Sequence, residues 1–103
     1  MSIVETTHGK VQGQLIQGLH AFLNIPFAAP PTGELRWSAP VDPQPWSGVR
    51  ETTAWGKQSW QAALQDMGPL GFAFNSRPTD AHDEDCLNLN VWTPAPDTRK
   101  RPV

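Results

Sequence analysis

Six prolines within residues 26–45 limit what this chain can fold into. Each proline fixes its own backbone angle φ, removes a hydrogen-bond donor and pushes the preceding residue toward an extended geometry. A long helix or a central sheet strand is therefore excluded here. Large apolar side chains lie among the prolines, whereas a disordered proline-rich linker is poor in them. We predict an ordered, irregular strap over residues 26–48 that contains Phe27, Leu35, Trp37, Val41 and Trp46.

Short strands are predicted on either side of this strap. Residues 2–6, 11–17 and 20–25 have the short apolar runs and glycine punctuation of a small antiparallel sheet, with a first turn at His8-Gly9-Lys10. Residues 86–92 alternate leucine or valine with asparagine, which is typical of a strand with one apolar face. Residues 57–66 allow a short helix.

The composition indicates a piece that relies on other structure for its core. The chain has 103 residues, of which 38% are hydrophobic, and a lone domain of that size buries only about two-thirds of its extended surface. A net charge of −2 argues against a nucleic-acid partner, because phosphates require a basic face. No apolar run is long enough to span a membrane. A single cysteine and no visible signal peptide favour a reducing, cytoplasmic location.

No complete catalytic constellation occurs in the sequence. It has no Gly-x-Ser-x-Gly elbow, no phosphate-binding glycine loop and no Cys/His spacing of a zinc site, so we expect neither cofactor nor metal. The acidic run from Asp80 to Asp85 lacks the alternating ligands and the glycine of a calcium loop, and is interpreted as a solvated turn. Cys86 follows an acidic pair, where a thiolate forms less readily, and is interpreted as a structural thiol.

Three segments, taken in order, resemble the type-B carboxylesterases (the carboxylesterase/cholinesterase family). The first runs from Gly9-x-Val11-x-Gly13 through Phe22-Leu23-Asn24-Ile25-Pro26 to Arg36-Trp37, the second from Pro40 to Trp46-Ser47-Gly48, and the third from Glu84-Asp85-Cys86-Leu87 to Pro94. Any one of them alone is a weak signal. Their order and spacing together identify the chain as similar to the opening portion of that family.

The resemblance implies an α/β fold in which residues 1–103 form the N-terminal segment of a single α/β-hydrolase domain. That segment comprises a small antiparallel sheet, the proline strap and the first strands of the main sheet, and is incomplete as an independent domain. The family hydrolyses small-molecule carboxylic esters with a Ser-His-Glu/Asp triad and a backbone oxyanion hole. These groups follow Val103 in the family's order. We therefore expect no catalytic residue here, and expect the remaining C-terminal portion of the enzyme as a separate chain.

The resemblance also implies structural roles for particular residues. Arg36 and Glu84 match an internal salt bridge that would tie the strap to the last strand, and a buried pair of this kind is costly to break from one side. Many members have a disulfide between the positions of Ser59 and Cys86, which serine makes impossible here. The loop of residues 60–85 is then expected to rely on packing alone, and a bacterial intracellular member is favoured.

In the family this loop lines the mouth of the active-site gorge. Its apolar residues are candidate substrate-binding groups that would form one wall of the gorge, while local packing under the loop is the competing interpretation. They are Met67, Leu70, Phe72 and Phe74. The tryptophan that stacks on choline in cholinesterases has its place near Ser76, so no choline site is expected. Because some family members have lost the triad, a non-catalytic β-rich binding or adhesion module remains the alternative.

Overall fold

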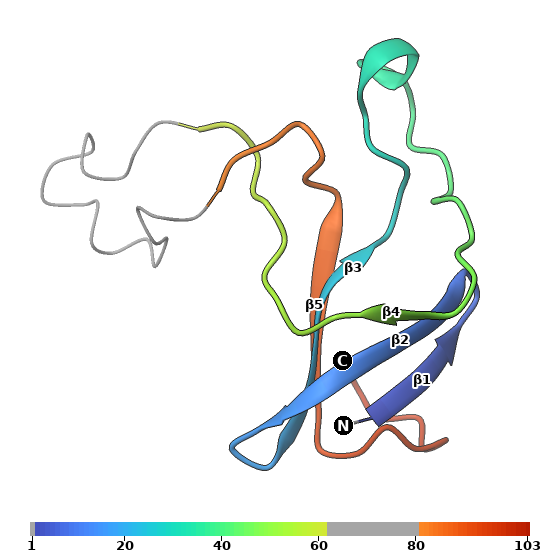
Figure 1. Cartoon of the computed structure of the whole chain (residues 1–103), viewed down its shortest axis with the longest axis vertical. Coiled ribbons are helices and arrows are strands. Elements are labelled where there is room, and N and C mark those ends of the chain that lie inside the picture. The colour runs from blue at the N-terminus through green and yellow to red at the C-terminus, as the bar shows by residue number, and fades with distance from the viewer. Residues whose placement is uncertain (1, 62–80) are drawn as a thin grey trace, which may run out of the picture.

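A bent, mostly antiparallel sheet with two long excursions makes up the computed structural model, which describes residues 2–61 and 81–103 (Figure 1). The strands are β1 (Ser2–Thr6), β2 (Gly9–Ile16), β3 (Leu19–Pro26), β4 (Val49–Glu51) and β5 (Asn88–Thr93), and one 3-10 turn, η1, spans Gly33–Leu35. The strand order is β1-β2-β3-β5, and β4 pairs in parallel with β2. The small antiparallel sheet predicted from the alternation is confirmed, with strand ends shifted by one or two residues.

Two tight turns connect the first three strands. Between β2 and β3, Gln17 and Gly18 have φ angles of 49° and 83°, and two successive positive values suit the right-handed twist of a hairpin. Between β1 and β2 the turn lies at Thr7-His8, one position earlier than predicted. Thr6 closes it, because its Oγ1 donates to the Gly9 carbonyl oxygen at 2.7 Å, so Gly9 already belongs to β2.

The sheet bends at Gly13 in the middle of β2. The first half of β2 pairs with β1, while Gln14, Leu15 and Ile16 pair with β3. A Cβ atom at Gly13 would lie 2.5 Å from the Ala21 carbonyl oxygen and 2.8 Å from the Phe22 ring. This close approach of β3 requires glycine, because even an alanine would force the two backbones apart.

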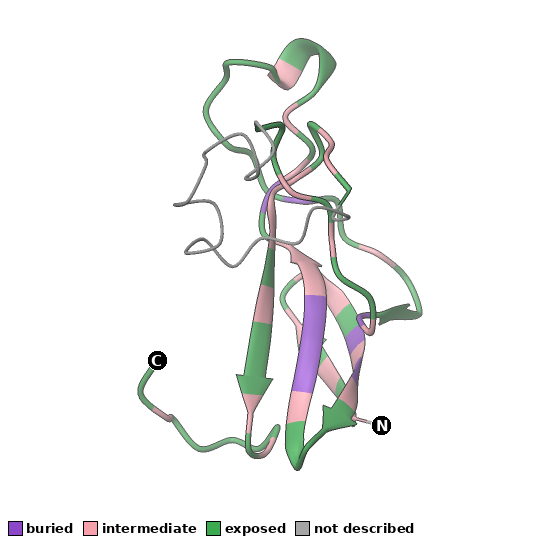
Figure 2. Cartoon of the chain, turned by 90° about the vertical axis from the view of Figure 1, so that its left-hand side faces the viewer, coloured by how far each residue is buried: buried purple, intermediate pink, exposed green. Residues whose placement is uncertain are grey.

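The apolar core is small and lies on β2 and β3 (Figure 2). Its buried hydrophobic residues are Val11, Ala21, Phe22, Leu23 and Ala28. Thr52 is also buried, but its Oγ1 donates to the Gln12 carbonyl oxygen at 2.8 Å, and its own carbonyl oxygen accepts from the Leu23 N–H at 2.8 Å. This bonding ties the segment after β4 to both strands without leaving a polar atom unpaired.

The sheet is covered much less well at β5. Leu89, Val91 and Trp92 are each between 40% and 47% exposed, so large apolar side chains of this strand are only partly covered. The Cα radius of gyration is 15.9 Å, against about 13 Å for a compact domain of this length. The chain is therefore less compact than an independent domain of its length, and its edge at β5 is partly open.

Two expectations from the sequence differ from the structure. The helix predicted over residues 57–66 is wrong for residues 57–61, which are extended, with Gln58 in a parallel bridge to His82; residues 62–66 lie outside the described part. The strand β4 was not predicted, and it forms because Trp46 donates from its Nε1 to the Lys10 carbonyl oxygen at 2.8 Å, which brings the following residues alongside β2. In residues 2–61 and 81–103 no helix is long and apolar enough to cross a membrane.

Candidate functional site

Residues 27–45, here called the arm, project from the end of β3 and carry η1 at their tip (Figure 1). The prolines leave few backbone donors; several of the others bond within the arm, while the Phe27 N–H donates to the Leu87 carbonyl oxygen at 3.2 Å. The Ala29 N–H donates to the Val41 carbonyl oxygen at 2.9 Å, which closes the base of the arm, and the Arg36 N–H donates to the Gly33 carbonyl oxygen at 3.2 Å. The predicted ordered strap is therefore present as a hairpin-like arm, held by its own backbone.

An ion pair joins this arm to the segment before β5. Arg36 Nη2 lies 2.6 Å from Glu84 Oε2, and the two side chains are 48% and 45% exposed. The hydrogen bond to Glu84, followed by the attraction of its charge, raises the pKa of the Arg36 guanidinium above its usual value. In this chain the pair is therefore half-exposed, whereas the resemblance implied an internal bridge, so its contribution here is that of a screened surface pair.

The two ends of the loop come together in a short contact, here called the loop neck (residues 57–60 and 81–83). The Gln58 N–H donates to the Ala81 carbonyl oxygen at 2.9 Å, and the Asp83 N–H donates back to the Gln58 carbonyl oxygen at 3.0 Å. Lys57 Nζ adds an ion pair to Asp83 Oδ2 at 3.1 Å. The pKa of Asp83 is lowered by the Asp85 N–H that donates to its carboxylate and then by the hydrogen bond from Lys57.

An aromatic contact completes the neck. The rings of Trp60 and His82 are stacked, with centroids 5.5 Å apart and an angle of 17° between their planes. The expectation that packing alone holds this loop is therefore wrong at its two ends, where hydrogen bonds, an ion pair and a ring stack act together. Cys86 is a free, half-buried thiol, and it lines the same hollow as Ser59.

The predicted gorge-wall residues Met67, Leu70, Phe72 and Phe74 lie outside the described residues. The structure shows how the two ends of their loop are held, and their role stays a prediction.

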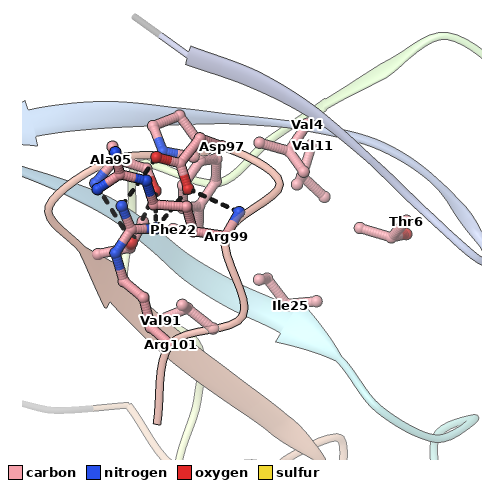
Figure 3. A pocket seen from close by; sticks show the side chains of 12 residues that line it. Val4, Thr6, Val11, Phe22, Ile25, Val91, Ala95, Asp97, Arg99 and Arg101 are labelled. Atoms are coloured by element: carbon pink, nitrogen blue, oxygen red, sulfur yellow. Dashed lines mark hydrogen bonds and ion pairs between the residues drawn. The ribbon is translucent and has the colours of Figure 1, made fainter. Parts of the chain in front are cut away.

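An apolar hollow of about 340 Å³ lies on one face of the sheet (Figure 3). Val4, Val11, Phe22, Ile25 and Val91 contribute its walls from four strands, and residues 95–101 close one side. That closing segment is fastened by Arg101, whose Nη2 donates to Asp97 Oδ2 at 2.8 Å, and this hydrogen bond lowers the pKa of Asp97. No local pattern in the sequence indicates this hollow, because its walls come from residues that are distant along the chain. Its walls are mostly apolar, with Thr6, Thr93, Asp97, Arg99 and Arg101 also among the lining residues, so it offers mainly packing surface.

The described residues supply little that could carry chemistry. Ser2 Oγ lies 2.5 Å from His20 Nδ1, but within residues 2–61 and 81–103 no carboxylate bonds to the other ring nitrogen of His20, and a serine–histidine pair needs such an orienting group to act as a nucleophile. Over the same ranges no cluster of three histidine, cysteine or acidic side chains could hold a metal ion. The arrangement is that of a scaffold.

Comparison with known proteins gives this scaffold a family. The model of the carboxylesterase family matches residues 1–103. Phenmedipham hydrolase of Pseudarthrobacter oxydans is 41% identical over 101 residues, which are 98% of this chain and 20% of that protein. Cocaine esterase of Homo sapiens is 41% identical over 106 residues, which cover 91% of this chain and 18% of that esterase. A crystal structure of carboxylesterase EST55 from Geobacillus stearothermophilus has a TM-score of 0.79 at 36% identity, covering 99% of this chain and 18% of the other. The chain thus spans about a fifth of the length of the curated relatives it matches.

Proposed function

Because this chain belongs to the carboxylesterase family, we propose that it is the N-terminal part of a carboxylic ester hydrolase and supplies scaffold and one wall of the active-site gorge. In this proposal the Ser-His-Glu/Asp triad and the oxyanion hole lie in the rest of the enzyme, which is the partner of this chain, and the chain alone is inactive. The substrate is a small-molecule ester. We further propose a cytoplasmic, bacterial enzyme, although relatives occur in bacteria and mammals alike.

The match to a carboxylesterase structure at a TM-score of 0.79 over 99% of this chain and only 18% of the other carries this proposal. A likeness over nearly the whole chain supports its place in that fold, and the low share of the relative leaves ample length for the catalytic groups. The small core agrees with a chain that acts as scaffold for the rest of the enzyme, because a segment that buries few side chains depends on neighbouring structure for its stability. The neck is consistent with a gorge-lining loop, because its contacts fasten the two ends of that loop to each other.

Hydrolysis of short chromogenic esters tests the proposed activity. We expect the complete protein to release 4-nitrophenol from 4-nitrophenyl acetate, and a serine-directed fluorophosphonate to abolish that release, because the proposed nucleophile is a serine. The chain of residues 1–103 alone should show no rate above background. A complete protein without hydrolysis would contradict the proposal and favour the non-catalytic binding module instead.

The gorge wall is tested by chain-length preference. Phe72→Ala and Phe74→Ala remove apolar area near the proposed acyl or alcohol position. The ratio of kcat/KM between acetate and octanoate esters should shift by roughly 10-fold to 200-fold, since one methylene in an apolar pocket contributes about 1–3 kcal/mol to discrimination. Phe27→Ala, which alters a half-exposed phenylalanine at the base of the arm, is the matched control and should leave that ratio unchanged. An unchanged ratio in all three variants would favour local packing as the role of Phe72 and Phe74.

A further inference from the structure

Trp37 stands almost entirely in water at the tip of the arm. It is 97% exposed, and its φ angle is +64°. A left-handed backbone is unfavourable for a bulky side chain because the Cβ atom crowds the neighbouring carbonyl group. An exposed indole is also unfavourable, since it presents a large apolar surface to solvent. Within residues 2–61 and 81–103 almost nothing covers the indole.

The surrounding arm nevertheless holds Trp37 firmly in this conformation. On one side the Arg36 N–H bonds to the Gly33 carbonyl oxygen at 3.2 Å, and its guanidinium pairs with Glu84. On the other side the Ser38 N–H bonds to the Leu35 carbonyl oxygen at 3.1 Å, and its Oγ bonds to the Glu34 carbonyl oxygen at 3.3 Å. Backbone strain of this kind persists only where the surroundings over-determine it, and it is concentrated at places with a function.

We propose that Trp37 is a preformed anchor through which the arm docks into an apolar pocket on the rest of the hydrolase domain. This inference rests on the proposed function, because it takes that remaining part as the partner. Rigidly presented tryptophans that fill a pocket dominate the energetics of protein interfaces. The partner pocket should be lined by aliphatic or aromatic side chains and offer an acceptor for the indole N–H, which otherwise would be buried unpaired.

The rest of the domain is a better occupant than a second copy of this chain. The relatives are about five times longer than the matched region, so a large partner surface accompanies this segment in each of them. The arm also presents Phe27 and Val41 at its base, which are 50% and 45% exposed, so apolar side chains are uncovered at both its tip and its base. A partner that follows the whole arm covers both ends of this surface.

The substitution Trp37→Gly tests the anchor through the sign of its effect on the melting temperature of the complete protein. Glycine relieves the left-handed strain, so an uncovered Trp37 predicts an equal or higher melting temperature. A docked Trp37 predicts a fall of roughly 3–6 °C, because the emptied pocket outweighs the relief. The matched control is Gln17→Gly, which alters another exposed residue with a positive φ, of 49°, and should leave the melting temperature equal or higher.

A second variant covers the case in which Trp37→Gly does not fold. Trp37→Phe keeps most of the apolar volume, and the difference in fluorescence between it and the unsubstituted protein reports the Trp37 indole alone. We expect that component to be shielded from acrylamide quenching. Full accessibility to acrylamide, or a higher melting temperature for Trp37→Gly, would overturn the proposal.

Two further readouts separate this inference from its premise and from a second copy. If the unsubstituted protein hydrolyses esters but Trp37→Gly behaves like Gln17→Gly, the anchor is wrong and the proposed function stands. If esters are not hydrolysed but Trp37→Gly loses stability, the proposed function fails and the docking role stands. If sedimentation shows that Trp37→Gly turns a dimer into a monomer, the pocket belongs to a second copy and the proposed occupant is wrong.

Discussion

The hairpin sheet of β1–β4 and the loop neck hold distant parts of the chain together by different means. In the sheet, buried side chains such as Phe22 and Leu23 lie behind the backbone ladder, and Thr52 has its polar groups satisfied within the core. In the neck, the contacting groups stay accessible: Trp60 is 69% exposed, and the side chains of the Lys57–Asp83 pair are about half exposed. Apolar burial is insensitive to salt and pH, whereas exposed polar contacts depend on both.

The bulge in β3 links these two regions. Asn24 interrupts the pairing of β3 with β5 and has a φ angle of 59°. Its N–H donates to Asn90 Oδ1 at 2.9 Å, and its side chain lies where a Cβ atom on Gly56 would collide with it, at 2.5 Å. Asparagine tolerates the left-handed region better than most other non-glycine residues, which suits it to this position in the bulge.

Phe22→Ala should have the largest effect of the substitutions that probe this contrast. It removes the largest buried side chain of the sheet core and leaves a cavity, so we expect the free energy of unfolding of the complete protein to fall by about 3–5 kcal/mol. Chemical denaturation in urea measures this change. Leu15→Ala is the control on the neighbouring strand, where the side chain is 61% exposed, and it should cost below about 1 kcal/mol. Equal losses for both would show that the sheet core does not carry the stability of this region.

Asn24→Val should have an intermediate effect, at the junction of the two regions. A β-branched residue is poorly tolerated at a positive φ, so the expected loss in the free energy of unfolding is about 1–3 kcal/mol by urea denaturation. Asn24→Gly is the matched control, and should be close to neutral because glycine adopts this backbone conformation freely. A valine variant as stable as the glycine variant would show that the bulge relaxes without cost.

Asp83→Asn should have the smallest effect, and it should be the one that depends on conditions. The folded-state pKa of Asp83 lies below its usual value, so its contribution is fully present above a pH of about 4 and is lost as the pH falls through the lowered value. Melting temperatures of the unsubstituted protein and the variant should therefore differ at pH 7, and converge in acid and at high salt.

Asp42→Asn removes an exposed carboxylate on the arm and serves as the control. It should show no comparable change between low and high salt. A difference between Asp83→Asn and the unsubstituted protein that persists unchanged in acid would mean that the carboxylate charge is not what holds the neck.

Local patterns predicted the parts of the fold that depend on residues close in sequence. Alternation and glycine placement located four of the five strands, and the proline run located the arm. β4 escaped prediction because Val49–Glu51 is short and exposed along its length. The bonds of Trp46 and Thr52 to β2, on either side of it, hold it in place. The helix over residues 57–66 was predicted from local composition. At residues 57–61 no helix forms, because the backbone of Gln58 pairs with the segment at His82 and Asp83 instead.

The candidate site was predictable to a different degree. Only the resemblance to a family suggested Arg36 and Glu84 as a pair, because 48 residues separate them and no local pattern connects them. The half-exposure of that pair, and the combination of contacts at the neck, had no signal in the sequence. In the sequence nothing distinguishes the side chains of the neck from other surface residues, and only the fold brings them into contact. They are Lys57, Trp60, His82 and Asp83.

The sequence by itself determined the family, the strand-rich opening, the proline arm and the lack of a triad in this chain, because each of these is encoded in neighbouring residues or in absent ones. Only the tertiary structure decided which side chains stay uncovered and which meet: the bend at Gly13, the neck that holds the loop where no disulfide can form, and the strained, exposed Trp37. Their physical reason is common to all three. Each depends on how closely two segments that are far apart in the sequence approach each other in space. Tertiary packing sets that approach, and the secondary-structure preference of neighbouring residues does not.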